Sequence, residues 1–247
     1  VRITVHNRGP AEATLHVLPT LWFRNTWSWG RDTVRPLLRQ VADGVVAATD
    51  PELGGRFLHC EGGPKLLFTD NETNTERIVR VPNRSPYVKD GINDYLVHGR
   101  DSAVNPEHTG TKVAAHYQLV VQAGSSRTVR LRLNDGAPVA AASLPGSSFG
   151  SGFDALMEKR QQEADEFYAT IIPSALDADA SNVMRQALAG MLWSKQFYHY
   201  DVEQWLEEHG SDPFKPVRQA PRNDRWHHMY NADIISMPDK WEYPWYA

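Results

Sequence analysis

The spacing of apolar residues changes near the middle of this 247-residue chain, and this change constrains the fold more than any other feature. Up to about residue 140, apolar and polar residues alternate, as in the opening run VRITVH. A period of two is typical of strands with one buried face. From Phe153 onward, apolar residues recur every three or four positions, which is typical of helices. The chain therefore predicts a β domain followed by helices.

Several short runs in the first half predict strands: ATLHVLPTLWF, GVVAAT, PKLLFT and ERIVRV. The run KVAAHYQLVVQAGSSRTVRLRL predicts a hairpin, because two alternating stretches flank Gly124, Ser125 and Ser126. Residues 82–110 form a long stretch rich in Asn, Asp, Gly and Pro, which predicts a functional or mobile loop. Many short antiparallel strands favour a β sandwich for residues 1–140.

The second half predicts a linker and two helices. Residues 136–152 are mostly small and predict a flexible connection, and the helix that follows ends before Pro173. Asp177 or Asp179 caps a second helix, which we expect to run on to Gly210. Two helices cannot close a domain alone, so we expect their apolar faces to be exposed and the chain to aggregate or pack loosely.

Composition excludes several classes of function. The net charge is −4 and no cluster of Lys and Arg stands out, so nucleic acid is not an expected partner. No apolar stretch approaches the ~20 residues that span a bilayer, so no membrane partner is expected either. The single cysteine, Cys60, excludes an internal disulfide and predicts a buried thiol in a reducing, cytoplasmic compartment. The chain does not predict an oligomeric state.

The chain is rich in aromatic residues, with 8 Trp and 9 Tyr. It ends on WEYPWYA, in which Trp241, Glu242, Tyr243 and Trp245 predict the lining of a site. Three roles stay open for Glu242: an acid whose pKa is raised by desolvation, an acceptor for substrate hydroxyls, or a structural partner of an Arg or Lys.

Two further groups are candidates for a binding site. Lys195, Gln196 and Tyr198 lie near the end of the second predicted helix, where they favour a cleft wall. Trp27 and Trp29 are two residues apart, so they share a face if the chain is extended. They predict either a strand edge packed into the sandwich or a loop that reaches a neighbouring domain.

Histidines near the C-terminus suggest a metal site only weakly. His227 and His228 are adjacent, and Asp224, Asp233 and His209 are conceivable further ligands. No zinc-binding spacing such as HExxH is present. We therefore expect no metal and no cofactor.

Two C-terminal stretches, GMLWSKQFYHYDVEQWL and YNADIISMPDKWEYPWYA, resemble bacterial members of glycoside hydrolase family 63. This family includes processing α-glucosidases and related mannosylglycerate or glucosylglycerate hydrolases. The stretch LPTLWFRNTWSW resembles the N-terminal β domain of the same proteins. Tyr246 stands where Phe is commoner in the family.

The resemblance implies a β super-sandwich in residues 1–140, whose start is missing, and a linker helix within residues 141–176. Residues 177–247 are then the beginning of an (α/α)6 barrel. It also implies an inverting mechanism with two carboxylates. The general acid is expected just past Ala247 and the base much later, so no catalytic residue is expected in this chain. The expected substrate-binding residues are Trp241, Glu242, Tyr243, Trp245, Lys195, Gln196, Tyr198, Trp27 and Trp29.

The sequence thus predicts a fragment, truncated at both ends, of an inverting hydrolase of α-glucosides or related α-glycosides, inactive alone. The alternative is a free-standing carbohydrate-binding β module without catalysis. The expected partner is a carbohydrate in both cases.

Overall fold

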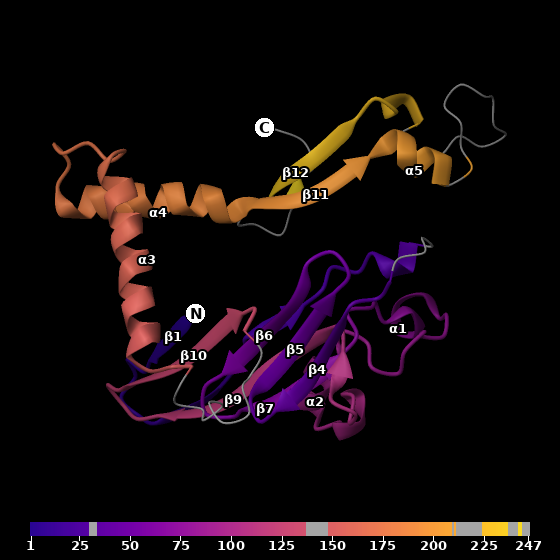
Figure 1. The fold of residues 1–247 in the computed structure, drawn as a ribbon, viewed down its shortest axis with the longest axis horizontal. Coiled ribbons are helices and arrows are strands. Elements are labelled where there is room, and N and C mark those ends of the chain that lie inside the picture. The colour runs from indigo at the N-terminus through magenta and orange to yellow at the C-terminus, as the bar shows by residue number, and fades with distance from the viewer. Residues whose placement is uncertain (30–33, 137–147, 209, 211–223, 237–241, 244–247) are drawn as a thin grey trace. The chain divides into compact units, whose positions relative to one another are not determined.

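The computed structural model describes residues 1–29, 34–136, 148–208, 210, 224–236 and 242–243. The chain divides into two compact units, Val1–Glu158 and Lys159–Ala247. Strands dominate the first unit, whereas the second holds helices and a small sheet (Figure 1). The predicted domain boundaries at residues 140 and 176 stay predictions.

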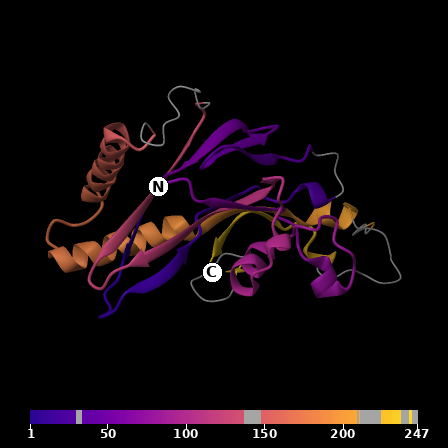
Figure 2. The ribbon, with the colours of Figure 1, turned by 90° about the horizontal axis from the view of Figure 1, so that it is seen from below.

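The first unit contains ten strands in its described part. They are β1 (Arg2–His6), β2 (Ala13–Val17), β3 (Thr20–Trp22), β4 (Leu37–Ala42), β5 (Val45–Asp50), β6 (Gly54–Cys60), β7 (Lys65–Thr69), β8 (Thr109–Gly110), β9 (Lys112–Val121) and β10 (Ser126–Asn134). Its short helices are η1 (Trp27–Trp29), α1 (Thr75–Val79), α2 (Gly91–His98) and η2 (Asp101–Ala103). Figure 2 shows α1 and α2 close together on one side of the strands.

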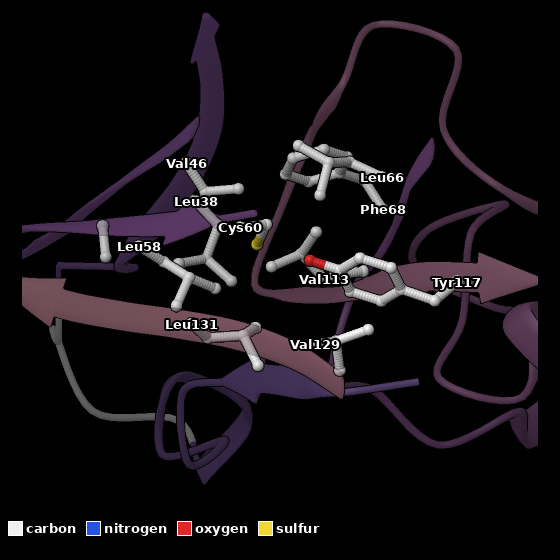
Figure 3. Close-up of a cluster of buried hydrophobic side chains, with 12 residues drawn as sticks. Leu38, Val46, Leu58, Cys60, Leu66, Phe68, Val113, Tyr117, Val129 and Leu131 are labelled. Carbon is white, nitrogen blue, oxygen red and sulfur yellow. The ribbon is translucent and has the colours of Figure 1, made fainter. Parts of the chain in front are cut away.

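These strands form two antiparallel sheets that share a hydrophobic core. One sheet has the order β1-β10-β6-β5-β4-β8, and in the other β9 pairs with β2, β3 and β7. Buried side chains from both sheets meet in one cluster (Figure 3). Phe68 and Val113 come from the smaller sheet, whereas Leu38, Val46 and Leu131 come from the larger one. The first unit is therefore a β-sandwich-like domain, as the alternating pattern predicts.

The predicted hairpin at residues 112–133 is wrong, although both of its strands exist. β9 and β10 follow each other in the chain but belong to different sheets. Tyr117 on β9 and Val129 on β10 both face the shared core, so the two strands pack face to face across it. Alternation identifies a buried face but not a pairing partner, which is why the sequence suggests a hairpin here.

The predicted strand ERIVRV is also wrong, because Thr75–Val79 form helix α1. Asn74 caps this helix, since its side-chain oxygen accepts a hydrogen bond of 3.1 Å from the backbone nitrogen of Arg77. Asn83 in turn donates to the same Asn74 oxygen, at 3.1 Å. The local cap outweighs the weak β pattern of this short run.

A tight turn at Asp43 and Gly44 joins β4 to β5. Gly44 has a φ of +63°. A Cβ atom there would stand 2.7 Å from the carbonyl oxygen of Cys60. Both the positive φ and the close approach require glycine at this position.

Helix α3 (Ser151–Ala169) contains the boundary between the units, and its first residues, which belong to the first unit, pack on the strands of that unit. Phe149 and Phe153 are buried, and the Arg130 guanidinium lies over both rings, at 5.8 and 5.6 Å. Arg130 also forms an ion pair with Asp154, at 3.6 Å. These contacts fix the start of α3 to β10.

The remaining elements of the second unit are α4 (Ala178–Ser194), β11 (Lys195–Asp201), α5 (Val202–Glu208), η3 (Asp224–Trp226), β12 (Tyr230–Ser236) and β13 (Glu242–Tyr243). Of the two predicted candidates, Asp177 caps α4, because its carboxylate accepts from the backbone nitrogen of Ala180 at 2.8 Å. Arg185 joins α4 to α3, with an ion pair to Asp165 at 2.6 Å.

The predicted continuation of the second helix to Gly210 is wrong. α4 ends at Ser194 and passes directly into β11 (Figure 1). The run KQFYHYD is rich in aromatic residues, which favour strands, and it pairs with β12. The backbone of residues 195–201 therefore forms its hydrogen bonds with β12, which is distant in sequence, and does not form two further turns of helix.

The end of α4 exposes large apolar side chains: Met191, Leu192 and Trp193, with Val183 two turns earlier. Trp193 is 86% exposed, although a buried indole contributes strongly to stability. The expected exposure of apolar helix faces is therefore confirmed for α4.

Candidate functional site

Two acidic side chains are buried directly after strand β7. Asp70 and Glu72 each keep only 8% of their surface exposed. Their backbone is fixed on both sides, since the nitrogen of Asp70 donates to the oxygen of Tyr87 at 2.7 Å and Lys89 donates to the oxygen of Glu72 at 3.0 Å. Buried carboxylates need partners, so the groups around them define a site.

Trp27 and Arg35 supply these partners. The indole nitrogen of Trp27 donates to Glu72 Oε1 at 2.9 Å. Arg35 forms an ion pair with Asp70 and lies 3.8 Å from Glu72 Oε1. Its guanidinium also lies 5.7 Å from the centre of the Trp27 ring. We call these four residues the Trp27 cluster.

The Trp27 cluster combines an aromatic ring, a cation and two carboxylates. The Arg35 side chain is 45% exposed, whereas both carboxylates are mostly covered. Arg35 can therefore still contact a polar solute, while Asp70 and Glu72 mainly hold Arg35 and Trp27 in position. Asn71 adds to this by donating to the backbone oxygen of Phe23 at 2.9 Å, which ties down the segment before Trp27.

Trp27 and Trp29 were predicted to share a face on the condition that the chain is extended there. The chain is not extended at these residues. They form the short 3₁₀-helix η1, in which residues two apart point in different directions. Trp27 is half-buried. Its indole nitrogen donates to Glu72, and the Arg35 guanidinium lies over its ring. The side chain of Trp29 lies outside the described residues.

The C-terminal candidates and the residues after α4 meet in one small sheet. Lys195 pairs with Ile235 across β11 and β12, and Ile235 pairs with Tyr243 across β12 and β13. Two segments almost 50 residues apart in sequence thus flank the same residue. Lys195 forms an ion pair with Asp233 at 3.1 Å, and its side chain is 64% exposed.

The remaining candidates are described only in part. Gln196 and Tyr198 lie in β11 and Glu242 in β13, but the positions of their side chains are outside the described structure, as is that of Tyr243. Trp241 and Trp245 lie outside the described residues altogether. Their roles stay predictions.

The described part of the chain holds no group of three or more His, Cys, Asp or Glu side chains that could bind a metal ion. His227 and His228 instead pack with aromatic neighbours. Their rings lie 5.7 Å apart, and His228 stacks on Trp226 at 6.0 Å. Asp233, another conceivable ligand, pairs with Lys195.

A polar pocket of about 360 Å³ lies between α1 and α2. Four of its charged side chains pair with one another, since Arg77 contacts Asp90 and Arg100 contacts Asp94, each at 3.1 Å. The pocket is lined by Asn74, Glu76, Arg77, Arg80, Asn83, Pro86, Val88, Asp90, Gly91, Asp94, Arg100 and Ala103. The two pairs thus engage four of the six charged side chains of the lining, and Glu76 and Arg80 are the other two.

Arg35, Asp70 and Glu72 were not among the residues predicted from the sequence. The signal that could have found the acids is the run TDNET, which places two carboxylates just after the apolar residues Leu66, Leu67 and Phe68. Arg35 has no comparable signal, because only the fold brings it to residues 70–72.

No helix in the described ranges is both long and apolar enough to cross a membrane. No protein-family model matches the chain. The chain is 35% identical, over 278 aligned residues, to the uncharacterized protein YMR196W of Saccharomyces cerevisiae. The match covers 100% of this chain but 26% of the yeast protein, so the chain spans about a quarter of that relative's length. Since the relative is itself uncharacterized, it assigns neither a family nor an activity.

Proposed function

We propose that this chain is part of an inverting glycoside hydrolase of family 63, which acts on α-glucosides or related α-glycosides. The resemblance of residues 190–206 and 230–247 to bacterial members of that family motivates the proposal. The observation that best supports it is the pairing of Ile235 with both Lys195 and Tyr243. This pairing brings residues of the two stretches that resemble the family into one sheet. A cleft wall requires such proximity of its contributing segments.

Under this proposal the first unit is the family's β super-sandwich, α3 is its linker helix, and α4 begins the (α/α)6 barrel. The exposed apolar end of α4 supports this assignment, because a barrel helix has neighbours on several sides. The small sheet β11-β12-β13 then lines the sugar-binding space.

The proposed binding residues suit a carbohydrate chemically. Trp241, Tyr243 and Trp245 offer rigid rings for the C–H faces of a sugar, while Lys195 and Gln196 can bind hydroxyl groups. Tyr198 joins the same wall, and Glu242 accepts hydrogen bonds from substrate. Trp27 and Trp29 are the proposed substrate-binding residues within the β domain, where Glu72 and Arg35 hold the Trp27 indole.

The proposed reaction uses two carboxylates, neither of them assigned within residues 1–247. An inverting hydrolase places them roughly 6.5–9.5 Å apart, so that water fits between the base and the anomeric carbon. One carboxylic acid protonates the leaving oxygen while the other removes a proton from the attacking water. The residues of this chain bind and orient the sugar.

The test is hydrolysis by a protein that contains this chain together with the downstream coding region. A panel of α-glucosides, glucosylglycerate and mannosylglycerate is incubated with it, and the anomeric protons of the fresh product are followed by ¹H NMR. We expect the β anomer to form first. An α anomer as first product, or no hydrolysis of any panel member, would count against the proposal.

A carbohydrate-binding module without catalysis is the second candidate. It is favoured by one observation, that the first unit has its own core drawn from both sheets. Titration calorimetry with the same sugars separates the two, because a module binds them while their anomeric signals stay unchanged. Binding without turnover would move the assignment to this candidate.

A further inference from the structure

Two histidines stand in contact on the smaller sheet of the first unit. His16 on β2 pairs in register with Gln118 of β9, so it lies diagonal to His116, two residues along the same strand. Nδ1 of His16 and Nε2 of His116 are 2.7 Å apart, and the ring centres are 5.0 Å apart with 24° between the ring planes, so the two rings meet edge to edge. One imidazole donates to the other across this contact.

The pair lies at the border of a small apolar cluster on the outer side of this sheet. Leu67, Ile92 and Ala114 form that cluster. The edge of the Tyr95 ring meets His116 at 6.3 Å. His16 is exposed and His116 half-buried, so solutes in water can reach the two nitrogens.

One cation lies beside the pair. Lys65 pairs in register with His116 across β7 and β9. Its ammonium donates to the Tyr95 hydroxyl at 2.6 Å and lies 4.7 Å from the centre of the Tyr95 ring. This positive charge opposes a second one at the histidines.

The geometry of the pair is close to that of two metal ligands. Zinc binds imidazole nitrogens at about 2.0–2.1 Å, so a tetrahedral ion holds two of them roughly 3.3 Å apart. From the observed 2.7 Å, the two side chains have to move apart and each ring has to turn until its nitrogen faces the ion. The strands hold the backbone of both residues, which lowers the entropy lost when a metal binds. Neutral imidazole favours zinc and copper over magnesium and calcium.

We propose that His16 and His116 form a two-histidine site for a divalent transition-metal ion, Zn²⁺ or Cu²⁺. Water completes the coordination shell, and the ion replaces the proton that the two imidazoles share. Lys65 limits the affinity through its charge. The site is independent of the carbohydrate function.

Calorimetric titration of the full chain with Zn²⁺ or Cu²⁺ alone, in a non-chelating buffer at pH 7.5, tests the site. We expect one equivalent of ion to bind more tightly than the rest, with affinity lowered at least tenfold in His16→Asn and in His116→Asn. Lys65→Met should raise the affinity. His98→Asn, at the exposed end of α2, is the matched control and should bind as the original chain does.

A second readout separates loss of the site from loss of folding. Saturating Zn²⁺ should raise the melting temperature of the original chain and of His98→Asn, because an ion that binds only the folded state stabilises it. His16→Asn, whose substituted side chain is exposed, should melt near the original temperature without metal and show no rise with it. Retained tight binding in both histidine variants would overturn the proposal, as would the absence of any bound equivalent in the original chain.

Discussion

At the scale of single residues, burial decides the chemistry of Cys60. The thiol lies in the core between the sheets (Figure 3) and is 5% exposed. Desolvation raises its pKa from 9.0 to about 12, because an apolar surrounding disfavours the thiolate. Cys60 is therefore a structural residue in this domain.

We expect Cys60 to resist modification while the chain is folded. Three pKa units correspond to about a thousandfold less thiolate at pH 8, so reaction with a disulfide reagent should slow by at least that factor. Labelling rates in buffer and in 6 M guanidinium chloride measure the difference. Equal rates in the two conditions would contradict the assignment of a buried thiol.

His59 makes stability depend on pH. Desolvation, helped by the charge of Arg132, lowers the pKa of His59 below its ordinary 6.5. The unfolded chain then binds more protons than the folded one below pH 6.5. Stability due to this group is complete above 6.5 and is lost as the pH falls toward the folded pKa.

Replacement by glutamine should remove that dependence. Urea unfolding at pH 5 and pH 7.5 should show a smaller difference in unfolding free energy for His59→Gln than for the original chain. His98→Gln, on the exposed end of α2, serves as control and should keep the original difference. An unchanged difference in His59→Gln would show that His59 titrates alike in both states.

At the scale of elements, the start of α4 depends on a single side chain. The Asp177 carboxylate accepts from the Ala180 nitrogen and satisfies one of the free donors of the first turn. Asp177→Ala should destabilise the second unit by about 1 kcal/mol, whereas Asp177→Asn retains an acceptor and should cost less. Chemical unfolding followed by far-UV circular dichroism measures both. No loss in Asp177→Ala would mean that the cap contributes nothing.

The elements that sequence reasoning misassigned share a cause. α1 and β11 are short, and their local patterns are ambiguous. The cap that Asn74 supplies stabilises α1 as a helix, and pairing with β12 stabilises β11 as a strand. Local propensity is worth less than these contacts in a run of five to seven residues.

At the scale of the whole chain, the core lies mainly in one unit. In the described part of the chain, the fully buried large side chains include Phe68, Leu38 and Leu67 in the first unit, with Leu206 and Val202 in the second. The two units therefore differ in how much apolar surface supports them, and we expect separate unfolding transitions.

Phe68→Ala should act on the first unit alone. Removal of this fully buried ring should cost about 3–5 kcal/mol, since it leaves a cavity between the two sheets. Calorimetry should show one transition shifted and the other unchanged. The control Phe167→Ala, at a half-exposed position on α3, should leave the temperature of the first unit's unfolding transition unchanged. A common shift of both transitions in Phe68→Ala would show that the units unfold together.

The sequence by itself determined the elements that short-range periodicity and capping control. These are the alternating strands of the β domain, the start of α4 at Asp177 or Asp179, and the apolar face that α4 leaves exposed. Each follows from residues within a few positions of one another, where side-chain spacing and backbone geometry are linked directly.

Only the tertiary structure decided which strands pair and which side chains meet. β9 and β10 are neighbours in sequence but lie in opposite sheets, and Arg35 reaches Asp70 from a separate segment. His16 and His116 are likewise joined by the pairing of β2 with β9. A period of two shows which face of a strand is buried but does not identify the strand with which it pairs. Contacts between distant segments therefore form only when the sheets assemble.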